Sequence, residues 1–372
     1  PSLVTLRAPL VCALSGHGIT VLAMAPNFDK RSDADIRTLG AIPVDCPISR
    51  TGTNPLRDVW NTWKMTLLLR QLKPDVTLAY FIKPVIFGSV AAWLAGIPHR
   101  FAMLEGLGFV FTPGARGLSF KRRVLKRIVL GLFKFGLSRV QRVIFLNPDD
   151  RDELVAAKVL PLDKAFLLGG IGVDLVKLPE TPPVLTPVTF ILVARLLREK
   201  GIEDYAAAAR IVKQKNPRVR FILLGGLDDN PGAIAEVDVQ LWVREGILEW
   251  YGHVPVQPWL ARTSVFVLPS YYREGVPAST QEALASGRAV ITTDVPGCRE
   301  TVMDGVNGFF VPPRDPQALG ERMQTFIPRP ELIVSMGQAS RRIAEERFDA
   351  HKVNQRLIGL LLADVQDGRG KL

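Results

Sequence analysis

The sequence predicts an α/β protein with two Rossmann-like domains, each built on a parallel sheet. Short apolar runs typical of buried strands alternate with helical patterns along most of the chain. The length of 372 residues suits two domains of the usual roughly 100–200 residues. The alternation pauses once, at residues 178–187, where four prolines exclude a helix and disfavour a strand. We therefore expect an interdomain linker there.

This pattern predicts four segments. Residues 1–177 form the first Rossmann-like domain, and residues 188–350 form the second one beyond the linker at 178–187. Residues 351–372 add a helix and a tail that we expect to pack back on the first domain. Because residues 2–11 already have a helical pattern, we expect the first strand of the first domain to be missing.

The expected elements follow one another as repeated strand–helix units, which place ligands at the carboxyl ends of the strands. In the first domain the strands are Ile19–Ala25, Val76–Phe81, Phe101–Leu104 and Val143–Leu146, and the helices are Leu56–Leu72, Phe87–Ala95 and Phe120–Arg139. In the second domain the strands are Thr189–Val193, Arg220–Leu224, Leu248–Tyr251, Val265–Leu268 and Ala289–Thr292, and the helices are Ile202–Lys215, Ala233–Glu245, Pro277–Ser286 and Pro316–Phe326.

Positive charge is concentrated in the first half of the chain. The net charge is +11, and residues 1–176 hold 23 Lys and Arg against 13 Asp and Glu. This asymmetry suggests an anionic partner: a phosphorylated substrate, a phospholipid surface or nucleic acid. The three cysteines are scattered and form no CxxC pair, which argues against a disulfide framework or a zinc site.

Two basic residues, Arg195 and Lys200, follow one expected strand and precede a helix. A guanidinium and an ammonium in this position can clamp a diphosphate and offset the charge of a departing nucleoside diphosphate. A charged surface loop has the same composition, so the spacing alone leaves both interpretations open.

A second group surrounds the start of a later helix. Its glycine allows a close approach of the backbone, and the free amides at the helix start favour an anion. Its two carboxylates are acceptors for sugar and ribose hydroxyls. One such Glu is more often a solvated surface charge, but the ensemble favours a phosphate and sugar site. The group consists of Glu274, Gly275, Val276 and Pro277 in the loop and Glu282 in the helix.

Taken together, these motifs resemble the retaining glycosyltransferases of family 4, which have the GT-B fold. The resemblance covers nearly all of residues 189–312 and includes the Glu-x7-Glu spacing of Glu274 and Glu282. It implies two Rossmann-like domains that face each other across a cleft. The matching residues are Arg195, Lys200-Gly201, Tyr251-Gly252-His253-Val254, Pro269 to Pro277, Glu282 to Gly287, Gly305 and Asn307-Gly308-Phe309.

The resemblance also implies roles for these residues. Glu274 would bind the hexose hydroxyls of the donor, and Glu282 would bind the nucleotide ribose. Arg195 and Lys200 would hold the diphosphate. The base would lie beside Gly252, His253 and Val254, and further donor contacts would come from Gly275, Val276 and Pro277.

The first half resembles a narrower branch of that family, whose members add a sugar to a polyprenyl-diphosphate-linked saccharide in polysaccharide or O-antigen assembly. Many family members have a His where this chain has Glu105. Glu105 is therefore a candidate for orienting the acceptor hydroxyl, although a turn or helix-cap carboxylate is an equal alternative. Lys83 is the other candidate on the acceptor side. The resemblance is carried by residues 80–88, 95–98, 103–109, 147–150 and 172–174.

Residues 116–142 hold nine basic residues and no acidic ones, interleaved with Phe, Leu, Ile and Val. A basic amphipathic helix suits an anionic membrane surface, whereas a solvated helix face usually mixes both signs of charge. No nucleic-acid recognition motif accompanies the charge. We therefore expect a cytoplasmic protein held peripherally on the inner face of the cytoplasmic membrane. The basic residues are Arg116, Lys121, Arg122, Arg123, Lys126, Arg127, Lys134, Arg139 and Arg142, with Arg122, Arg123, Lys126 and Arg127 as the membrane contacts.

The expected reaction is transfer of a hexose or N-acetylhexosamine, with retention at the anomeric carbon, from a UDP-sugar or another nucleotide sugar to a lipid-linked saccharide. Since the cationic pair does the work of a metal ion, we expect metal independence and no cofactor. One alternative is an epimerase or a polymer-extending glycosyltransferase on the same fold, against which the basic apolar helix argues. The other is a non-catalytic sugar-binding protein, which has no need of Arg195, Lys200 and the Glu pair together.

Overall fold

The computed structural model describes residues 4, 6–48, 54–114, 117, 119–228, 230 and 232–369. The chain divides into two compact units, one of residues 1–171 with 350–372 and one of residues 172–349. All strand pairs in both units are parallel within the described residues. This confirms the predicted α/β class with two parallel-sheet domains.

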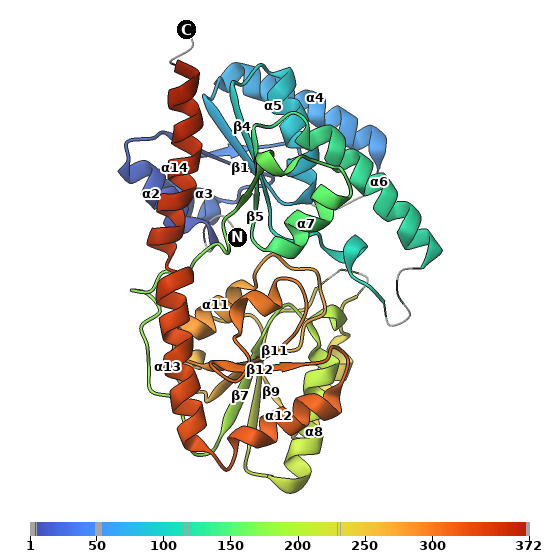
Figure 1. The fold of residues 1–372 in the computed structure, drawn as a ribbon, viewed down its shortest axis with the longest axis vertical. Helices are drawn as coiled ribbons and strands as arrows, with labels where there is room; N and C mark the ends of the chain where they lie inside the picture. Colours follow the sequence, from blue (N-terminus) through green and yellow to red (C-terminus); the bar gives the residue numbers. More distant parts are fainter. Residues whose placement is uncertain are drawn as a thin grey trace. The chain divides into compact units, whose positions relative to one another are not determined.

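The second unit is built on one six-stranded sheet (Figure 1) with the order β12-β11-β10-β7-β8-β9. Every residue of β7, β10 and β11 is buried, as expected for the inner strands of a parallel sheet covered on both faces. The strands are β7 (Thr189–Val193), β8 (Arg220–Leu224), β9 (Glu249–Trp250), β10 (Val265–Leu268), β11 (Ala289–Thr293) and β12 (Gly308–Val311).

Helices cover this sheet in two pairs (Figure 1). Helix α8 (Ile202–Lys215) packs with α12 (Pro316–Phe326), and α11 (Ala278–Ala285) packs with α13 (Pro330–Arg347). Phe190 and Phe221 stack at 5.3 Å in the core beneath α8. The remaining elements are α9 (Glu236–Arg244), α10 (Gln257–Leu260) and the short 3-10 helices η4 (Arg198–Lys200) and η5 (Cys298–Thr301).

The first unit has two smaller parallel sheets, β1-β2 and β3-β4-β5-β6. All five residues of β3 are half-buried, in contrast to the inner strands of the second unit. The strands are β1 (Val21–Ala25), β2 (Ala41–Asp45), β3 (Val76–Tyr80), β4 (His99–Leu104), β5 (Arg142–Phe145) and β6 (Ala165–Leu167). The expected missing strand is not tested by these residues and stays a prediction.

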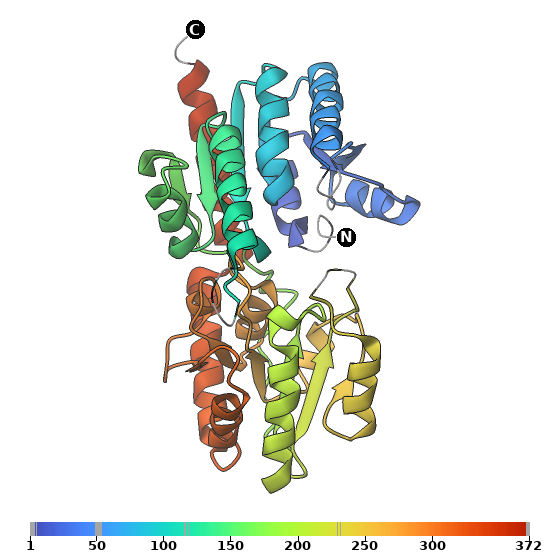
Figure 2. The same ribbon diagram turned by 90° about the vertical axis from the view of Figure 1, so that its right-hand side faces the viewer.

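Three helices of the first unit lie side by side: α4 (Pro55–Leu72), α5 (Ser89–Leu94) and α6 (Phe120–Leu137), drawn in blue, cyan and teal in Figure 2. The expected helix at Phe87–Ala95 starts earlier than predicted, as a π-helical turn η1 (Pro84–Gly88) that continues into α5. The other helices are α2 (Ala8–Gly16), α3 (Lys30–Thr38), η2 (Phe109–Phe111), α7 (Pro148–Ala156) and η3 (Leu162–Lys164).

The last helix, α14 (Ala350–Arg369), belongs to the first unit and packs against α2. Arg356 of α14 donates hydrogen bonds to the carbonyls of Leu167 and Leu168, both at 3.1 Å. The chain thus returns to its first unit after completing the second.

The predicted linker at 178–187 is wrong, because this segment is part of the second unit. Thr181 donates its backbone amide to Ser286, and Val184 donates its own to Thr263. Arg288, which is fully buried, donates to the Thr181 carbonyl at 2.8 Å. The prolines hold the segment extended, so its carbonyls are available to the Arg288 guanidinium.

Candidate functional site

The predicted donor residues follow neighbouring strands of the second sheet. Strands β11, β10, β7 and β8 are adjacent and parallel, so their carboxyl ends lie along one edge. Ligands of open parallel sheets bind at this edge. The loops after these strands carry Arg195 and Lys200 after β7, Glu274 to Pro277 after β10, and Gly297 after β11.

Lys200 and Glu274 form the ion pair at the centre of this edge. The Lys200 Nζ lies 2.5 Å from Glu274 Oε2, and the two side chains are only 12% and 14% exposed. Ser270 donates its hydroxyl to the other carboxylate oxygen, Oε1, at 3.0 Å. The sequence placed both residues in a donor site, but it gave no sign of this direct pairing. The two contacts restrict the Glu274 side chain to few rotamers, which holds it beside Lys200.

Backbone contacts hold the Glu274 loop against its neighbours. Tyr271 donates its amide to the Glu199 carbonyl at 2.9 Å, and Thr293 at the end of β11 donates its hydroxyl to the Ser270 carbonyl. Gly297 has φ +82°, and a Cβ there would lie 2.5 Å from the Glu274 carbonyl oxygen. Only glycine fits this close approach, which brings the loop after β11 directly under the Glu274 loop.

Arg195 is engaged by a residue that the sequence did not single out. Its Nη1 lies 2.7 Å from Asp228 Oδ2, in the loop after β8. Hydrogen bonds from the Asn230 amide and from Arg195, together with the Arg195 charge, lower the pKa of Asp228 despite the opposing effect of burial. The Arg195 side chain is 44% exposed, so it presents its guanidinium at the surface while Asp228 orients it.

The segment expected beside the nucleotide base lies next to the loop after β8. Gly225 donates its amide to the Gly252 carbonyl at 2.8 Å, and a Cβ on Gly226 would lie 3.6 Å from the His253 Cβ. Gly225 itself has φ +151°, and a Cβ there would lie 1.7 Å from the Ala194 carbonyl oxygen. The Gly225-Gly226 pair directly after a strand was the sequence signal that could have identified this turn.

Glu282 lies inside α11, as predicted, and is half-buried. Burial raises its pKa to about 7, so the carboxyl changes its charge near neutral pH. The helix is shorter than expected, since Pro277 precedes its first residue, Ala278. Gln281, beside Glu282, ties the helix start to the loop by donating to the Val276 carbonyl at 3.1 Å.

This edge combines cations, helix amides and carboxylates within one unit. Lys200 and Arg195 supply positive charge, and the start of α11 follows a loop whose Gly275, Val276 and Pro277 are buried. Such a group can neutralise a diphosphate and accept hydrogen bonds from hydroxyls. The arrangement can therefore bind a phosphorylated polyol and stabilise a departing phosphate.

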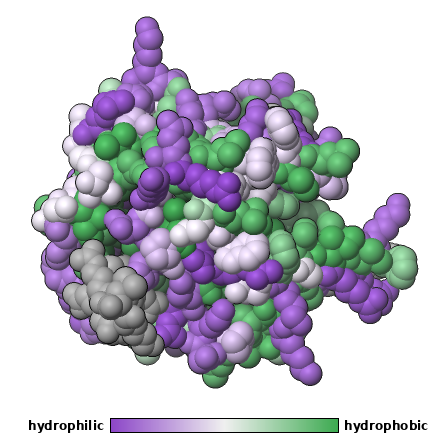
Figure 3. Space-filling view, turned by 90° about the horizontal axis from the view of Figure 1, so that it is seen from above, coloured by the Kyte–Doolittle hydropathy of each residue, from purple (hydrophilic) through white to green (hydrophobic). Residues whose placement is uncertain are grey.

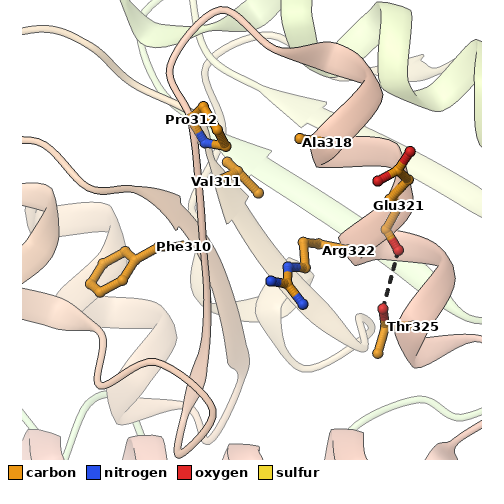
Figure 4. Close-up of a pocket in the computed structure, with 7 residues that line it drawn as sticks. All are labelled: Phe310, Val311, Pro312, Ala318, Glu321, Arg322 and Thr325. Atoms are coloured by element: carbon orange, nitrogen blue, oxygen red, sulfur yellow. Dashed lines mark hydrogen bonds between the residues drawn. The ribbon is translucent and has the colours of Figure 1, made fainter.

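A shallow pocket elsewhere in the second unit takes no part in this site. It lies between the edge strand β12 and α12 and has a volume of about 340 Å³ (Figure 4). None of the predicted site residues lines it. Its walls are formed by Phe310, Val311, Pro312, Ala318, Glu321, Arg322 and Thr325.

The acceptor-side candidates of the first unit are engaged in ion pairs. Glu105 contacts the Arg7 guanidinium, and both side chains are nearly buried, at 13% and 6% exposed. Arg7 also lies over the Tyr80 ring at 4.9 Å, and burial lowers its pKa to about 10. The ion pair with Arg7 was not expected from the sequence, and a role of Glu105 in orienting the acceptor stays a prediction. Lys83 is paired with Asp58 at 2.9 Å.

The four expected membrane contacts on α6 divide into two kinds. Arg122 lies 3.9 Å over the Phe109 ring and donates to the Thr112 carbonyl, and Lys126 pairs with Glu153 at 2.5 Å. Both side chains are thus already engaged within the first unit, and their contact with a membrane stays a prediction. Arg123 and Arg127, one helical turn apart, are exposed as expected. Arg116 lies outside the described residues.

The exposed side of α6 is also apolar, which agrees with an amphipathic helix at a surface. Its exposed side chains include Phe120, Val124, Leu125, Ile128, Leu132 and Phe135. Among the described residues, no helix has both the length and the apolar character that a membrane span requires.

Comparison with known proteins identifies the second unit. Residues 187–328 match the family model "Glycosyl transferases group 1". The chain is 25% identical over 374 residues to the N,N'-diacetylbacillosaminyl-diphospho-undecaprenol alpha-1,3-N-acetylgalactosaminyltransferase of Campylobacter jejuni, covering 95% of this chain and 94% of that protein. It is 27% identical over 271 residues to the UDP-Gal:alpha-D-GlcNAc-diphosphoundecaprenol alpha-1,3-galactosyltransferase of Escherichia coli, covering 69% and 67%.

The fold is that of solved glycosyltransferase structures. Anabaena HepE, crystallised with UDP and glucose, superposes with a TM-score of 0.76 at 18% identity, covering 97% of this chain and 96% of that one. A glycosyltransferase from Rickettsia africae superposes with a TM-score of 0.74 at 14% identity, covering 98% and 95%. The chain has the GT-B fold, and the residues that match the glycosyl transferases group 1 model include Arg195, Lys200 and Glu274.

Proposed function

We propose that the protein is a retaining glycosyltransferase of family 4 that moves a hexose or N-acetylhexosamine from a UDP-sugar to a polyprenyl-diphosphate-linked saccharide. The observation that carries the proposal is the pairing of Lys200 with Glu274 at the strand ends of a group 1 domain. It places one cation for phosphate beside one carboxylate for sugar hydroxyls.

The donor binds along the carboxyl edge of the second sheet. Lys200 and Arg195 hold the diphosphate, and Glu274 accepts hydrogen bonds from hexose hydroxyls. Glu282 accepts those of the ribose when it is ionised. The base lies beside Gly252, His253 and Val254.

The reaction breaks the bond between the anomeric carbon and the β-phosphate oxygen, and its electron pair leaves with the nucleoside diphosphate. The acceptor hydroxyl attacks the same face of the sugar, and its proton passes to the departing phosphate oxygen. Lys200, Arg195 and the start of α11 stabilise the negative charge that develops there. Because these groups supply the positive charge, the proposal includes no metal ion and no cofactor. Glu274 is held by Lys200 and Ser270, which suits binding better than nucleophilic attack.

The relatives support the choice of donor and acceptor. Two of them are named for undecaprenyl-diphosphate-linked acceptors, and HepE was solved with UDP and with UDP-glucose. A Staphylococcus aureus relative is named for capsular polysaccharide biosynthesis, at 25% identity over 329 residues. A role in bacterial cell-surface polysaccharide or O-antigen assembly follows.

A lipid-linked acceptor requires the protein to work at a membrane surface. We place it peripherally on the inner face of the cytoplasmic membrane, with the exposed Arg123 and Arg127 of α6 toward anionic headgroups. No nucleic-acid partner is included in the proposal.

A donor panel tests the proposal. The protein is incubated with UDP- and GDP-sugars and an undecaprenyl-diphosphate-linked saccharide, and the product is analysed by mass spectrometry and by the NMR coupling of its anomeric proton. The expected result is one glycosidic bond with the anomeric configuration of the donor. An inverted product would refute retention, a changed donor sugar without transfer would indicate an epimerase, and binding without turnover would indicate a sugar-binding protein.

A further inference from the structure

Helix α4 presents an apolar stripe to solvent from Leu56 to Leu67. Its members recur at spacings of three, one, three and four residues, which places them on one face of a helix. They are between 47% and 82% exposed, although their class of side chain is normally buried. The stripe consists of Leu56, Val59, Trp60, Trp63 and Leu67.

The opposite face of α4 explains why the stripe is not a packing surface. Met65 and Leu69 are buried in the core cluster that α4 shares with α5. The helix therefore already uses one apolar face for the fold and has a second one without a covering element among the described residues. Exposed contiguous apolar surface of this kind marks an interaction site.

The exposed charges of α4 are all basic. Arg57, Lys64 and Arg70 are exposed, and Lys64 lies 5.5 Å above the Trp60 ring. The acidic residue of this helix, Asp58, is turned away from solvent and paired with Lys83. A partner of this face must therefore accept apolar side chains and carry negative charge.

The stripe continues onto the two neighbouring helices. Arg70 donates to the carbonyl of Leu94 at the end of α5, where Trp93 and Leu94 are 40% and 41% exposed. Arg139 lies 4.2 Å over the Trp93 ring and 5.3 Å from the Phe135 ring of α6. Helices α4, α5 and α6 thus each expose aromatic side chains, with cations close by. Figure 3 looks down on the first unit and shows apolar residues, in green, interleaved with hydrophilic ones, in purple.

We infer that the α4 stripe is a lipid-contacting face, in which Trp60 and Trp63 enter the interfacial layer of an anionic membrane. Tryptophan prefers this layer because its ring is apolar and its indole N–H is polar. The flanking cations gain from the negative surface potential of the headgroups. A second copy of the chain fits less well, since it would bring Arg57, Lys64 and Arg70 against their own counterparts.

This inference deepens the proposed function, on which it rests for its biological meaning, by adding a contact that the basic helix α6 does not supply. Its test requires neither donor nor acceptor. A failed transferase assay therefore leaves the result on lipid binding intact, and a failed lipid assay leaves the transferase proposal intact.

The test uses the full chain with vesicles of phosphatidylethanolamine and phosphatidylglycerol, and with phosphatidylcholine vesicles for comparison. In co-sedimentation, Trp60→Ala with Trp63→Ala lowers partition onto the anionic vesicles about tenfold or more, because apolar area is lost from the interface. Trp60→Phe with Trp63→Phe retains most of the partition. Brominated lipids quench the wild-type tryptophan fluorescence, and this quenching is reduced in the Phe variant, which keeps Trp93 on the neighbouring helix.

The matched control changes an exposed apolar pair on the second unit. Val237 and Leu241 of α9 are 65% and 48% exposed and lie beside Glu236 and Asp238. Val237→Ala with Leu241→Ala leaves partition unchanged. Unquenched wild-type fluorescence, or partition that the Trp60→Ala, Trp63→Ala variant leaves unchanged, would overturn the inference. A dimer that this variant converts to a monomer, without loss of vesicle binding, would assign the stripe to a contact between copies instead.

Discussion

The two units of the chain carry their charged groups in different ways. In the second unit, Lys200 and Arg195 are held by Glu274 and Asp228 in loops that follow buried, adjacent strands. In the first unit, Arg123 and Arg127 stand exposed on a helix among apolar side chains. A small ligand with defined stereochemistry needs fixed partners, whereas a fluid lipid surface needs only charge and apolar area.

The sheets of the two units also differ, and the sheet of the second unit is larger and more buried. The second unit has one continuous sheet of six strands, in which every residue of β7, β10 and β11 is buried. The first unit has sheets of two and four strands, and its β3 is half-buried throughout. A rigid sheet edge positions catalytic groups precisely, so we expect substitutions in the second unit to affect turnover and those on the first unit's helices to affect localisation.

The largest expected effect comes from removing the central cation of the donor site. Lys200→Ala should lower kcat/KM for transfer by about 10²–10³, because one preorganised charge no longer stabilises the departing diphosphate. Lys213→Ala is the matched control on the following helix, where the Lys213 ammonium donates to the Gly246 carbonyl. If Lys200→Ala transfers sugar as well as the control does, the comparison between the units fails.

One added methyl group at Gly297 should disrupt the close packing of this residue against the Glu274 backbone. Gly297→Ala should lower the free energy of unfolding by about 1–3 kcal/mol, because the residue has positive φ and its Cβ would collide with the Glu274 carbonyl. Donor turnover should fall with it. Gly246 has a similar φ of +68°, but no atom lies within 4 Å of an added Cβ there. Gly246→Ala therefore measures the destabilisation that positive φ causes without a steric clash. Equal melting temperatures for the two variants would show that the close approach does not matter.

The exposed cations of α6 test the part of the comparison that concerns the first unit, its binding to anionic lipid. Arg123→Gln with Arg127→Gln should weaken binding to anionic vesicles roughly thirtyfold, at roughly 1 kcal/mol per basic residue. Arg122→Gln should have a smaller effect on binding, since its guanidinium is already engaged by Phe109 and Thr112. Turnover of donor with a detergent-solubilised acceptor should not change.

Flotation of vesicles at low and high salt measures these differences. Lys215→Gln with Arg218→Gln removes two exposed charges from the second unit and serves as the control. Equal losses for the α6 pair and the control pair would mean that binding follows net charge rather than the α6 surface.

The smallest expected effect is the pH dependence of donor binding. Burial holds the pKa of Glu282 at about 7, so the carboxylate is ionised above that pH and protonated below it. If ionised Glu282 accepts the ribose hydroxyls, the KM for donor rises up to about tenfold as the pH falls by one unit below the pKa. Glu282→Gln should bind the donor more weakly, and its KM for donor should depend less on pH. Glu282 affects the stability of the fold in the opposite direction. Because its pKa is raised in the folded protein, the protonated carboxyl stabilises the fold at low pH, and this stabilisation is lost as the pH rises through about 7.

Sequence patterns located the second unit more accurately than the first. The strands Thr189–Val193, Arg220–Leu224 and Val265–Leu268 were predicted to the residue, because strands that are largely buried on both faces are near-continuous apolar runs. The strand Ala41–Asp45 was missed, since its Pro43 argues against a strand. Among the residues that the structure describes, β2 pairs with β1 alone, and a proline is tolerated in such an edge strand.

The donor cluster was predictable as a set, but not its internal pairing. Arg195, Lys200 and Glu274 were found through strand ends and spacing, yet their partners Asp228 and Ser270 depend on which strands become neighbours. The same limit explains Glu105, whose partner Arg7 lies far from it in sequence. The proline-rich segment was misplaced because its role depends on the buried Arg288, which no local pattern reveals.

Calorimetric titration of UDP and of the UDP-sugar donor tests most directly whether Lys200 binds the diphosphate of the donor and Glu274 binds its sugar. We expect Lys200→Ala to weaken both ligands, because both contain the diphosphate. Glu274→Gln should weaken the UDP-sugar but leave UDP as tight or tighter, since it removes a carboxylate that competes for Lys200. Loss of UDP affinity in Glu274→Gln equal to its loss of UDP-sugar affinity would contradict the division of roles on which the account rests.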